Sequence, residues 1–171
     1  MAGEYTFENA NLGVFHGIAG TLSAQGKFEG VLQHTDSQGN IDIPNFMVTR
    51  SQHPVHLRSE LQAIVNGTNG DVQLERVTTR FLKTTVLARG EIAHHAGQEG
   101  KVASLALSVR DGGVQDVLRL FVRGANPPWP LHGVTSFRAH VTIPPGDVLF
   151  LHKVRLTGHL KPEGARRKSW E

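Results

Sequence analysis

The histidines are the residues of this chain that most readily suggest chemistry, since imidazole binds metal ions and exchanges protons near neutral pH. There are ten of them, but their spacing is unfavourable for a metal site. His94 and His95 are adjacent, so on a strand they would point to opposite faces. His53 and His56 have Pro54 between them, and no carboxylate lies at a matching offset. A helical HExxH pair is absent, and we therefore expect no bound metal.

Nucleophilic and acid–base catalysis find no better support in the sequence. The chain has no cysteine and no G-x-S-x-G elbow. Four serines lie inside alternating segments, where a serine usually faces solvent: Ser23, Ser59, Ser104 and Ser136. The carboxylates are scattered and form no close pair: Glu60, Asp71, Glu75 and Asp116. We expect a protein that is not an enzyme and uses no cofactor; an enzyme with a histidine-based site would require several histidines to converge.

The segment NGTNGD, Asn66–Asp71, is the one loop whose composition suggests a ligand. Asp71 is its only acid, which is too few for a calcium loop, and the G-x-x-x-x-G-K-[ST] pattern of a phosphate loop is absent. Asn66-Gly67-Thr68 is also a glycosylation sequon, which has meaning only in a eukaryotic secretory protein. Asn and Gly accept positive φ angles and make tight hairpins, so we expect a hinge between two strands.

The elements that must position these residues are mostly strands. Apolar and polar residues alternate within segments 20–32, 55–65, 101–111 and 135–143, which is typical of strands with one buried face. A turn is expected at Ser37–Asn40, and Pro44 is expected at a strand start or on an edge strand. The pattern predicts eight to ten short strands joined by hairpins in a single domain over residues 1–160.

One segment has helical spacing instead. Val114, Val117, Leu118 and Phe121 recur at i, i+3, i+4 and i+7, which predicts an amphipathic helix near 114–123. Asp111 is a candidate cap, Asp116 lies near the positive end of the helix dipole, and Gly124 is a candidate terminator. We expect about ten helical residues packed with one face on the sheet.

The predicted fold is therefore mainly β: a curled antiparallel sheet with one short amphipathic helix. Its apolar face has two possible roles. It could pack on a second sheet, as in a closed β-sandwich, or it could stay open as a groove that holds acyl chains. Composition does not separate these alternatives.

Charge and hydropathy exclude several partners. The chain has 171 residues and a net charge of +3, and a good part of the excess is in the tail at 161–171, which contains Arg166, Arg167 and Lys168 and is expected to be disordered. A basic tail alone does not predict nucleic-acid binding, which needs cations spread over one face. No stretch approaches the length of a transmembrane helix, and no signal sequence opens the chain.

Several motifs in order carry a resemblance to a known family. They are IPNF, VNGTNGD, VQDVLRLF and IPPGD, within residues 20–158. This arrangement resembles the C-terminal region of AsmA-like proteins of the bacterial cell envelope. The segment NPPWPLHGVTSF is longer than the family's usual link, and the sequence after Gly158 does not resemble the family.

The resemblance implies a segment of a bridge-like lipid-transport protein, with a β-taco sheet whose hydrophobic groove guides phospholipid acyl chains in outer-membrane assembly. It implies a periplasmic location, an inner-membrane anchor present only in the full-length protein, and possible contacts with other envelope proteins. The family supplies no catalytic residues. Parity alone selects the groove candidates Leu22, Ala24, Phe28, Leu32, Phe46, Val48, Leu61, Ala63, Val65 and Leu74. The alternative function is a non-catalytic structural or interaction domain of the envelope.

Overall fold

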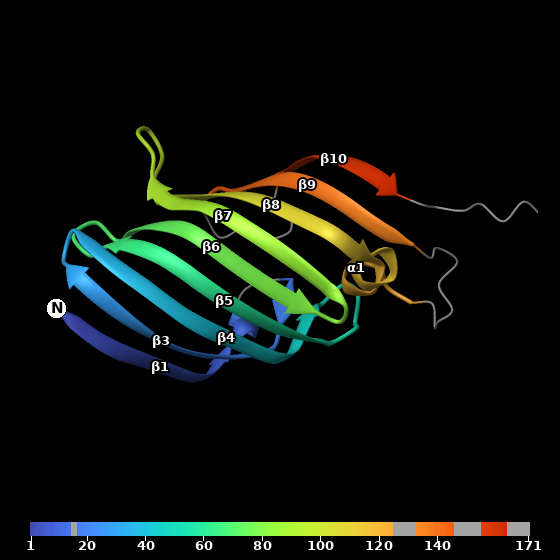
Figure 1. Cartoon of the computed structure of the whole chain (residues 1–171), viewed down its shortest axis with the longest axis horizontal. Helices are drawn as coiled ribbons and strands as arrows, with labels where there is room; N and C mark the ends of the chain where they lie inside the picture. The colour runs from blue at the N-terminus through green and yellow to red at the C-terminus, as the bar shows by residue number, and fades with distance from the viewer. Residues whose placement is uncertain (15–16, 125–132, 146–154, 164–171) are drawn as a thin grey trace, which may run out of the picture.

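The computed structural model describes residues 1–14, 17–124, 133–145 and 155–163. Nine strands form one antiparallel sheet in the order β1-β3-β4-β5-β6-β7-β8-β9-β10, and the short strand β2 pairs with β4 beside this path (Figure 1). The elements are β1 (Ala2–Asn11), η1 (Leu12–Val14), β2 (Ile18–Ala19), β3 (Thr21–Val31), β4 (His34–Val48), β5 (Val55–Asn66), β6 (Asp71–Phe81), β7 (Thr84–His94), β8 (Lys101–Gly113), α1 (Val114–Phe121), β9 (Val134–Ile143) and β10 (Arg155–Glu163).

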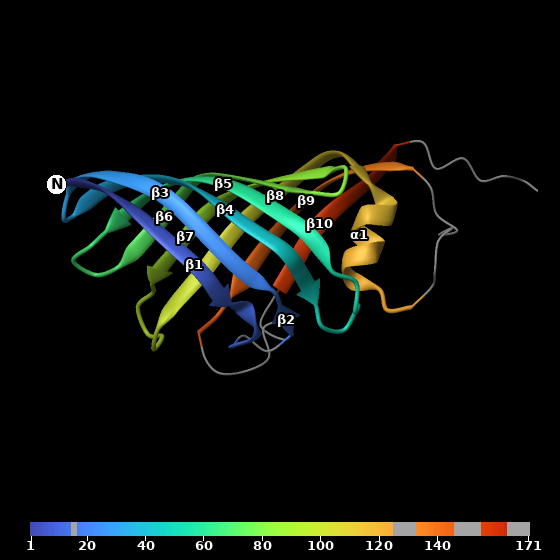
Figure 2. The ribbon, with the colours of Figure 1, turned by 90° about the horizontal axis from the view of Figure 1, so that it is seen from below.

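The sheet is open and curled. In the part of the chain that the structure describes, β1 and β10 each have a single neighbour, so the sheet does not close into a barrel. Figure 2 shows that the strands near β1 cross those near β10, because the right-handed twist accumulates over nine strands. The expected curled antiparallel sheet with one short helix is confirmed, and the closed β-sandwich is wrong.

One face of the sheet is sheltered and the other is exposed. Along β5, Val55, Ser59 and Ala63 are buried, while Arg58 and Glu60, which have the other parity, are exposed. Paired residues of neighbouring strands point to the same face, so this alternation continues from strand to strand. Among the described strand residues, every buried one except Val102 lies on the sheltered face, which we call the apolar face.

Helix α1 covers one end of the apolar face. Leu120 of α1 is buried in a cluster with Val48 of β4, Val55 of β5 and Phe81 of β6. Asp116, in the first turn, accepts hydrogen bonds through Oδ2 from the Lys83 backbone N–H at 3.0 Å and from Thr84 Oγ1 at 2.7 Å. The helix is thus fixed to the β6–β7 turn by a carboxylate and to the sheet by a leucine.

The strands differ from the sequence prediction in length and in one turn. All strands except β2 have 9 to 15 residues, so the expectation of short strands is wrong. The expected turn at Ser37–Asn40 is also wrong, because these residues lie inside β4 and the chain reverses between Val31 and His34. Glycine and polar residues favour turns, but here residues 37–40 pair with β3 on one side and with β5 on the other, and this pairing keeps them in a strand.

Pro44 lies inside β4, so its expected place at a strand start or edge is wrong. It lies between Ile43 and Phe46, where the pairing of β4 with β5 shifts register. An irregularity of this kind accommodates proline because no ladder hydrogen bond is needed from it there.

Helix α1 begins at Val114, as predicted, but its caps and its C-terminal end differ from the prediction. The helix has 8 residues, its N-cap is Gly113 without a side-chain hydrogen bond, and its C-cap is Val122. Asp111 belongs to β8 and has a positive φ of 53°, so it does not cap the helix. At the other end of the chain, β10 continues to Glu163, so residues 161–163 of the predicted tail form part of a strand. The rest of that tail, and the segment 125–132, lie outside the described residues.

Candidate functional site: the apolar face

The register carries apolar residues across the sheet in continuous rows. One row, from β3 to β9, consists of Phe28, Ser37, Ala63, Leu74, Gly90, Leu105 and Val141. The next row consists of Gly26, Gly39, Leu61, Val77, Ala88, Leu107 and Ala139. The apolar face is thus a surface of aliphatic and small side chains spanning at least seven strands.

Nine of the ten candidates from the sequence lie on this face or at its α1 end, where Phe46 and Val48 pack in or against the buried cluster. Leu22, Ala24, Phe28, Leu61, Ala63, Val65 and Leu74 share the face through the register of β3, β5 and β6. Leu32 is the exception, because it lies in the β3–β4 turn and is 52% exposed.

The other residues of the face were only partly visible in the sequence. The alternation within segment 101–111 indicated a strand with one buried face, whereas residues 84–94 lay outside the alternating segments. The structure places Val86, Ala88 and Gly90 on the apolar face, opposite residues of β8. Parity sorts residues within a strand, but only the register between strands shows that separate strands contribute to one surface.

The polar groups on the apolar face are largely satisfied within the protein. Ser59 and Thr79, from β5 and β6, are hydrogen-bonded to each other at 2.8 Å. Thr35 Oγ1 donates to the carbonyl oxygen of Val31, also at 2.8 Å. Since bonded hydroxyls need no water, these residues leave the face effectively apolar.

Aromatic rings shape the part of the face nearest β1. A side chain on either Gly26 or Gly39 would meet the ring of Tyr5, and a side chain on Gly3 would meet the ring of Phe28. The side chains of Tyr5 and Phe28 therefore lie over glycines, which replaces missing side-chain packing near a sheet edge. Tyr5 and Phe7 also pack together, with ring centroids 6.0 Å apart.

The NGTNGD segment is the hairpin that sets the β5–β6 register. Asn66 pairs with Asp71, and the Gly70 N–H donates to the carbonyl oxygen of Asn66 at 2.6 Å. The Asn side chains bond the turn itself, since Thr68 N–H donates to Asn66 Oδ1 and Asp71 N–H donates to Asn69 Oδ1. Gly70 has a φ of +72°, which glycine adopts without strain. The expected hinge is confirmed.

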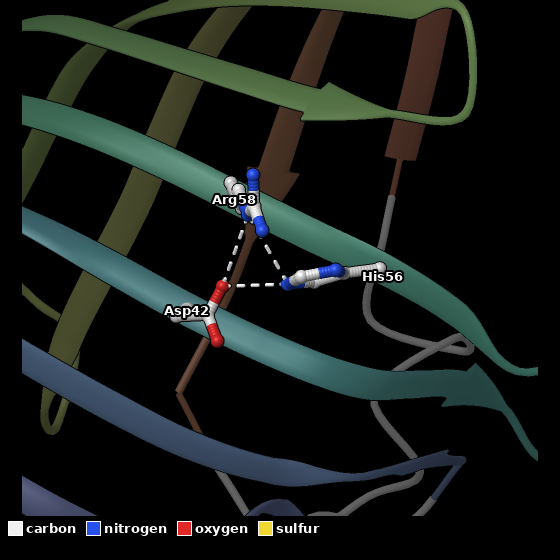
Figure 3. A network of polar contacts seen from close by, with 3 residues as sticks. All are labelled: Asp42, His56 and Arg58. Carbon is white, nitrogen blue, oxygen red and sulfur yellow. Dashed lines mark hydrogen bonds and ion pairs between the residues drawn. The ribbon is translucent and has the colours of Figure 1, made fainter.

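The opposite face carries a polar network that the sequence did not reveal. Asp42 of β4 lies opposite Arg58 of β5, and Asp42 Oδ1 is 2.6 Å from Nε2 of His56 and 3.4 Å from Nε of Arg58 (Figure 3). The sequence offered no signal for it, because the carboxylate comes from a neighbouring strand. The hydrogen bond from His56 holds the pKa of Asp42 below its ordinary value, and the nearby Arg58 adds to this effect.

These three side chains are substantially exposed, so the network is a weak candidate for catalysis. Their side-chain exposures range from 42% to 71%. Water screens such ion pairs, and they contribute little to stability. No group of three or more His, Asp or Glu residues within the described ranges gathers closely enough to hold a metal ion.

Open hollows occur between the long side chains of the polar face. One of them has a volume of about 760 Å³, and polar-face residues such as Gln25, Gln62 and Arg76 line most of it. A second, of about 620 Å³, includes Asp42 and Arg58. Their lining of amides and charges suits water or polar solutes rather than acyl chains.

Two further observations bear on identity. None of the helices that the structure describes is long and apolar enough to cross a membrane. No protein-family model, curated protein or solved structure matches the chain.

Proposed function

We propose that this chain is a segment of an AsmA-like envelope protein whose apolar face binds and guides phospholipid acyl chains between the inner and outer membranes. The observation that carries the proposal is the row of mostly apolar or small residues that the register aligns across the sheet, from Phe28 and Ala63 to Leu105 and Val141. The family resemblance of the motifs within residues 20–158 supports the same assignment. In this proposal the protein is a periplasmic, non-enzymatic carrier.

The mechanism is passive, and its driving force is the apolar area that an acyl chain removes from water. Moving one CH₂ group from water to an apolar surface contributes roughly 0.8 kcal/mol. An acyl chain that is only partly sheltered therefore gains several kcal/mol, without any contact that fixes one position. Because aliphatic side chains repeat along the face, neighbouring positions have similar affinity, and a chain can slide between them.

Native mass spectrometry of the chain purified from lipid-containing cells tests this proposal. We expect phospholipid masses to be bound to the folded protein. Leu61→Asn should reduce their fraction, because it places an amide on the apolar face, whereas Gln62→Asn, at the next position on the polar face, should not. A folded chain without bound phospholipid, beside a longer chain that carries it, would show that this segment is not a competent carrier.

An interaction domain is the second candidate, and the free edge of β1 favours it. Met1 and Gly30 exchange both backbone hydrogen bonds, at 2.6 and 2.9 Å. In an antiparallel pair every second residue of a strand bonds its neighbour. Since Met1 bonds β3, the N–H and C=O groups of Ala2, Glu4 and Thr6 point away from β3. A partner strand could pair there. Thr6→Pro would abolish such pairing and leave lipid binding intact.

A further inference from the structure

The end of the molecule that carries α1 displays apolar side chains next to cations. Four large apolar residues there remain well exposed: Leu82 at 50%, Phe121 at 53%, Val122 at 40% and Val134 at 45%. They come from the β6–β7 turn, the C-terminal end of α1 and the start of β9. We call these four residues the tip patch.

Contacts beneath the tip patch hold its parts together. Phe81 and Leu120, the chain neighbours of Leu82 and Phe121, are buried in the same cluster. Val134 pairs with Gly113 immediately before α1, and the Val114 N–H donates to the Gly133 carbonyl oxygen at 3.2 Å. An 8-residue helix is about 12 Å long, so the patch surrounds one short helix.

Cations accompany the tip patch. Lys83, Arg119 and Arg123 are exposed and make no ion pair with any residue that the structure describes. Asp116, in the first turn of α1, is half-buried and already accepts hydrogen bonds from the Lys83 backbone and from Thr84. The tip therefore combines exposed apolar area with cations that make no ion pair within the described part of the chain.

The opposite end of the sheet differs in charge. Leu32 and Val31 are exposed there at 52% and 62%, so apolar area is also present. The nearby charged residues include the exposed carboxylates Glu29 and Asp36, and Lys101 is paired with Asp71 at 3.4 Å. This end lacks the cationic excess and provides an internal control.

We infer that the tip patch docks on the surface of an anionic phospholipid bilayer. Exposed apolar side chains enter the interface while Lys and Arg beside them contact lipid phosphates, the combination found in interfacial helices. The inference rests on the proposed function, because it identifies the end of the sheet at which lipids enter or leave the apolar face. Its test does not depend on lipid uptake by that face.

The absence of cysteine in the sequence allows a site-specific test. A single cysteine at position 121 (Phe121→Cys) or at position 32 (Leu32→Cys) is labelled with an environment-sensitive fluorophore. Each protein is mixed with vesicles of phosphatidylcholine alone or with phosphatidylglycerol added. We expect a blue shift at position 121 with phosphatidylglycerol vesicles only, and none at position 32.

Two charge variants separate docking from nonspecific attraction. Neutralising Lys83 and Arg123 together (Lys83→Gln, Arg123→Gln) should weaken partitioning about fivefold for each charge, which corresponds to about 1 kcal/mol each. The matched variant Lys27→Gln, on the polar face and away from the tip, should change it little. Circular dichroism checks that each variant is folded.

Three outcomes would overturn the inference: no blue shift at position 121, equal shifts at positions 121 and 32, or partitioning that responds equally to Lys27→Gln. If docking holds while native mass spectrometry finds no bound phospholipid, the proposed function fails and the docking stands. If native mass spectrometry finds bound phospholipid but the tip patch does not dock on vesicles, the docking inference is rejected and the proposed function stands.

Discussion

Ala63 of β5 and Leu74 of β6 lie opposite each other, and both face the apolar side of the sheet. A bulge follows at once, so Gln62 pairs with Arg76 and Leu61 pairs with Val77. The bulge adds one unpaired residue to β6. Without it the alternation of the two strands would be offset, and Leu61 and Val77 would no longer share a face. The NGTNGD hairpin and this bulge together align β5 with β6.

The hairpin prediction concerns Gly70, whose φ of +72° disfavours any side chain. Gly70→Ala should lower the free energy of unfolding by about 1–2 kcal/mol, the cost of left-handed backbone for an L-residue. The new Cβ would also lie 2.8 Å from Lys101 Nζ. Thr68→Ala in the same turn should change stability by less than about 0.5 kcal/mol. Urea denaturation measures both, and equal effects would contradict the role given to φ.

The helix anchor can be tested at Asp116. Asp116→Ala removes the acceptor of two hydrogen bonds and leaves the Lys83 N–H and the Thr84 hydroxyl without it. We expect a loss of about 1–3 kcal/mol in the free energy of unfolding. In a double-mutant cycle with Thr84→Val, the two effects should be non-additive by at least about 0.5 kcal/mol. Simple additivity would mean that the two side chains act independently.

A pH prediction follows from Asp42. His56 donates to its carboxylate and holds its pKa below the ordinary value, so the folded state binds the proton less readily than the unfolded state. The stabilisation is therefore present above about pH 4 and is lost as the pH falls through the lowered pKa. His56→Ala should raise the pKa of Asp42, as measured by NMR titration of its carboxyl carbon. An unchanged pKa would show that the contact in Figure 3 does not persist in solution.

Some of this fold could be predicted from the sequence, and some could not, for physical reasons. Alternation within a strand is local, so the shared side of Leu61, Ala63 and Val65 was predictable. The place of Ser37–Asn40 was not, because turn propensity there is outweighed by pairing with both neighbouring strands. The start of α1 was predictable, but its caps and its end at Phe121 were missed, because the helix is fixed by Asp116 and Leu120 through tertiary contacts rather than by a capping side chain.

The candidate site divides in the same way. Parity found residues of the apolar face strand by strand, but it could not join Leu74 to Gly90 and Leu105, because register between strands depends on turns and bulges. It could not pair Asp42 with His56 either, since residues that meet across two strands leave no spacing signal in the chain.

The measurement that tests the central claim most directly compares two consecutive positions of β5. Leu61 faces the apolar side and Gln62 the polar side, so single cysteines at 61 and 62 report on opposite faces of one strand. Each is labelled with an environment-sensitive fluorophore and titrated with a short-chain phosphatidylcholine below its critical micelle concentration. The proposed function predicts a saturable change in emission at position 61 and none at position 62. Equal changes at both positions, or a change at position 62 alone, would contradict acyl-chain binding on the apolar face.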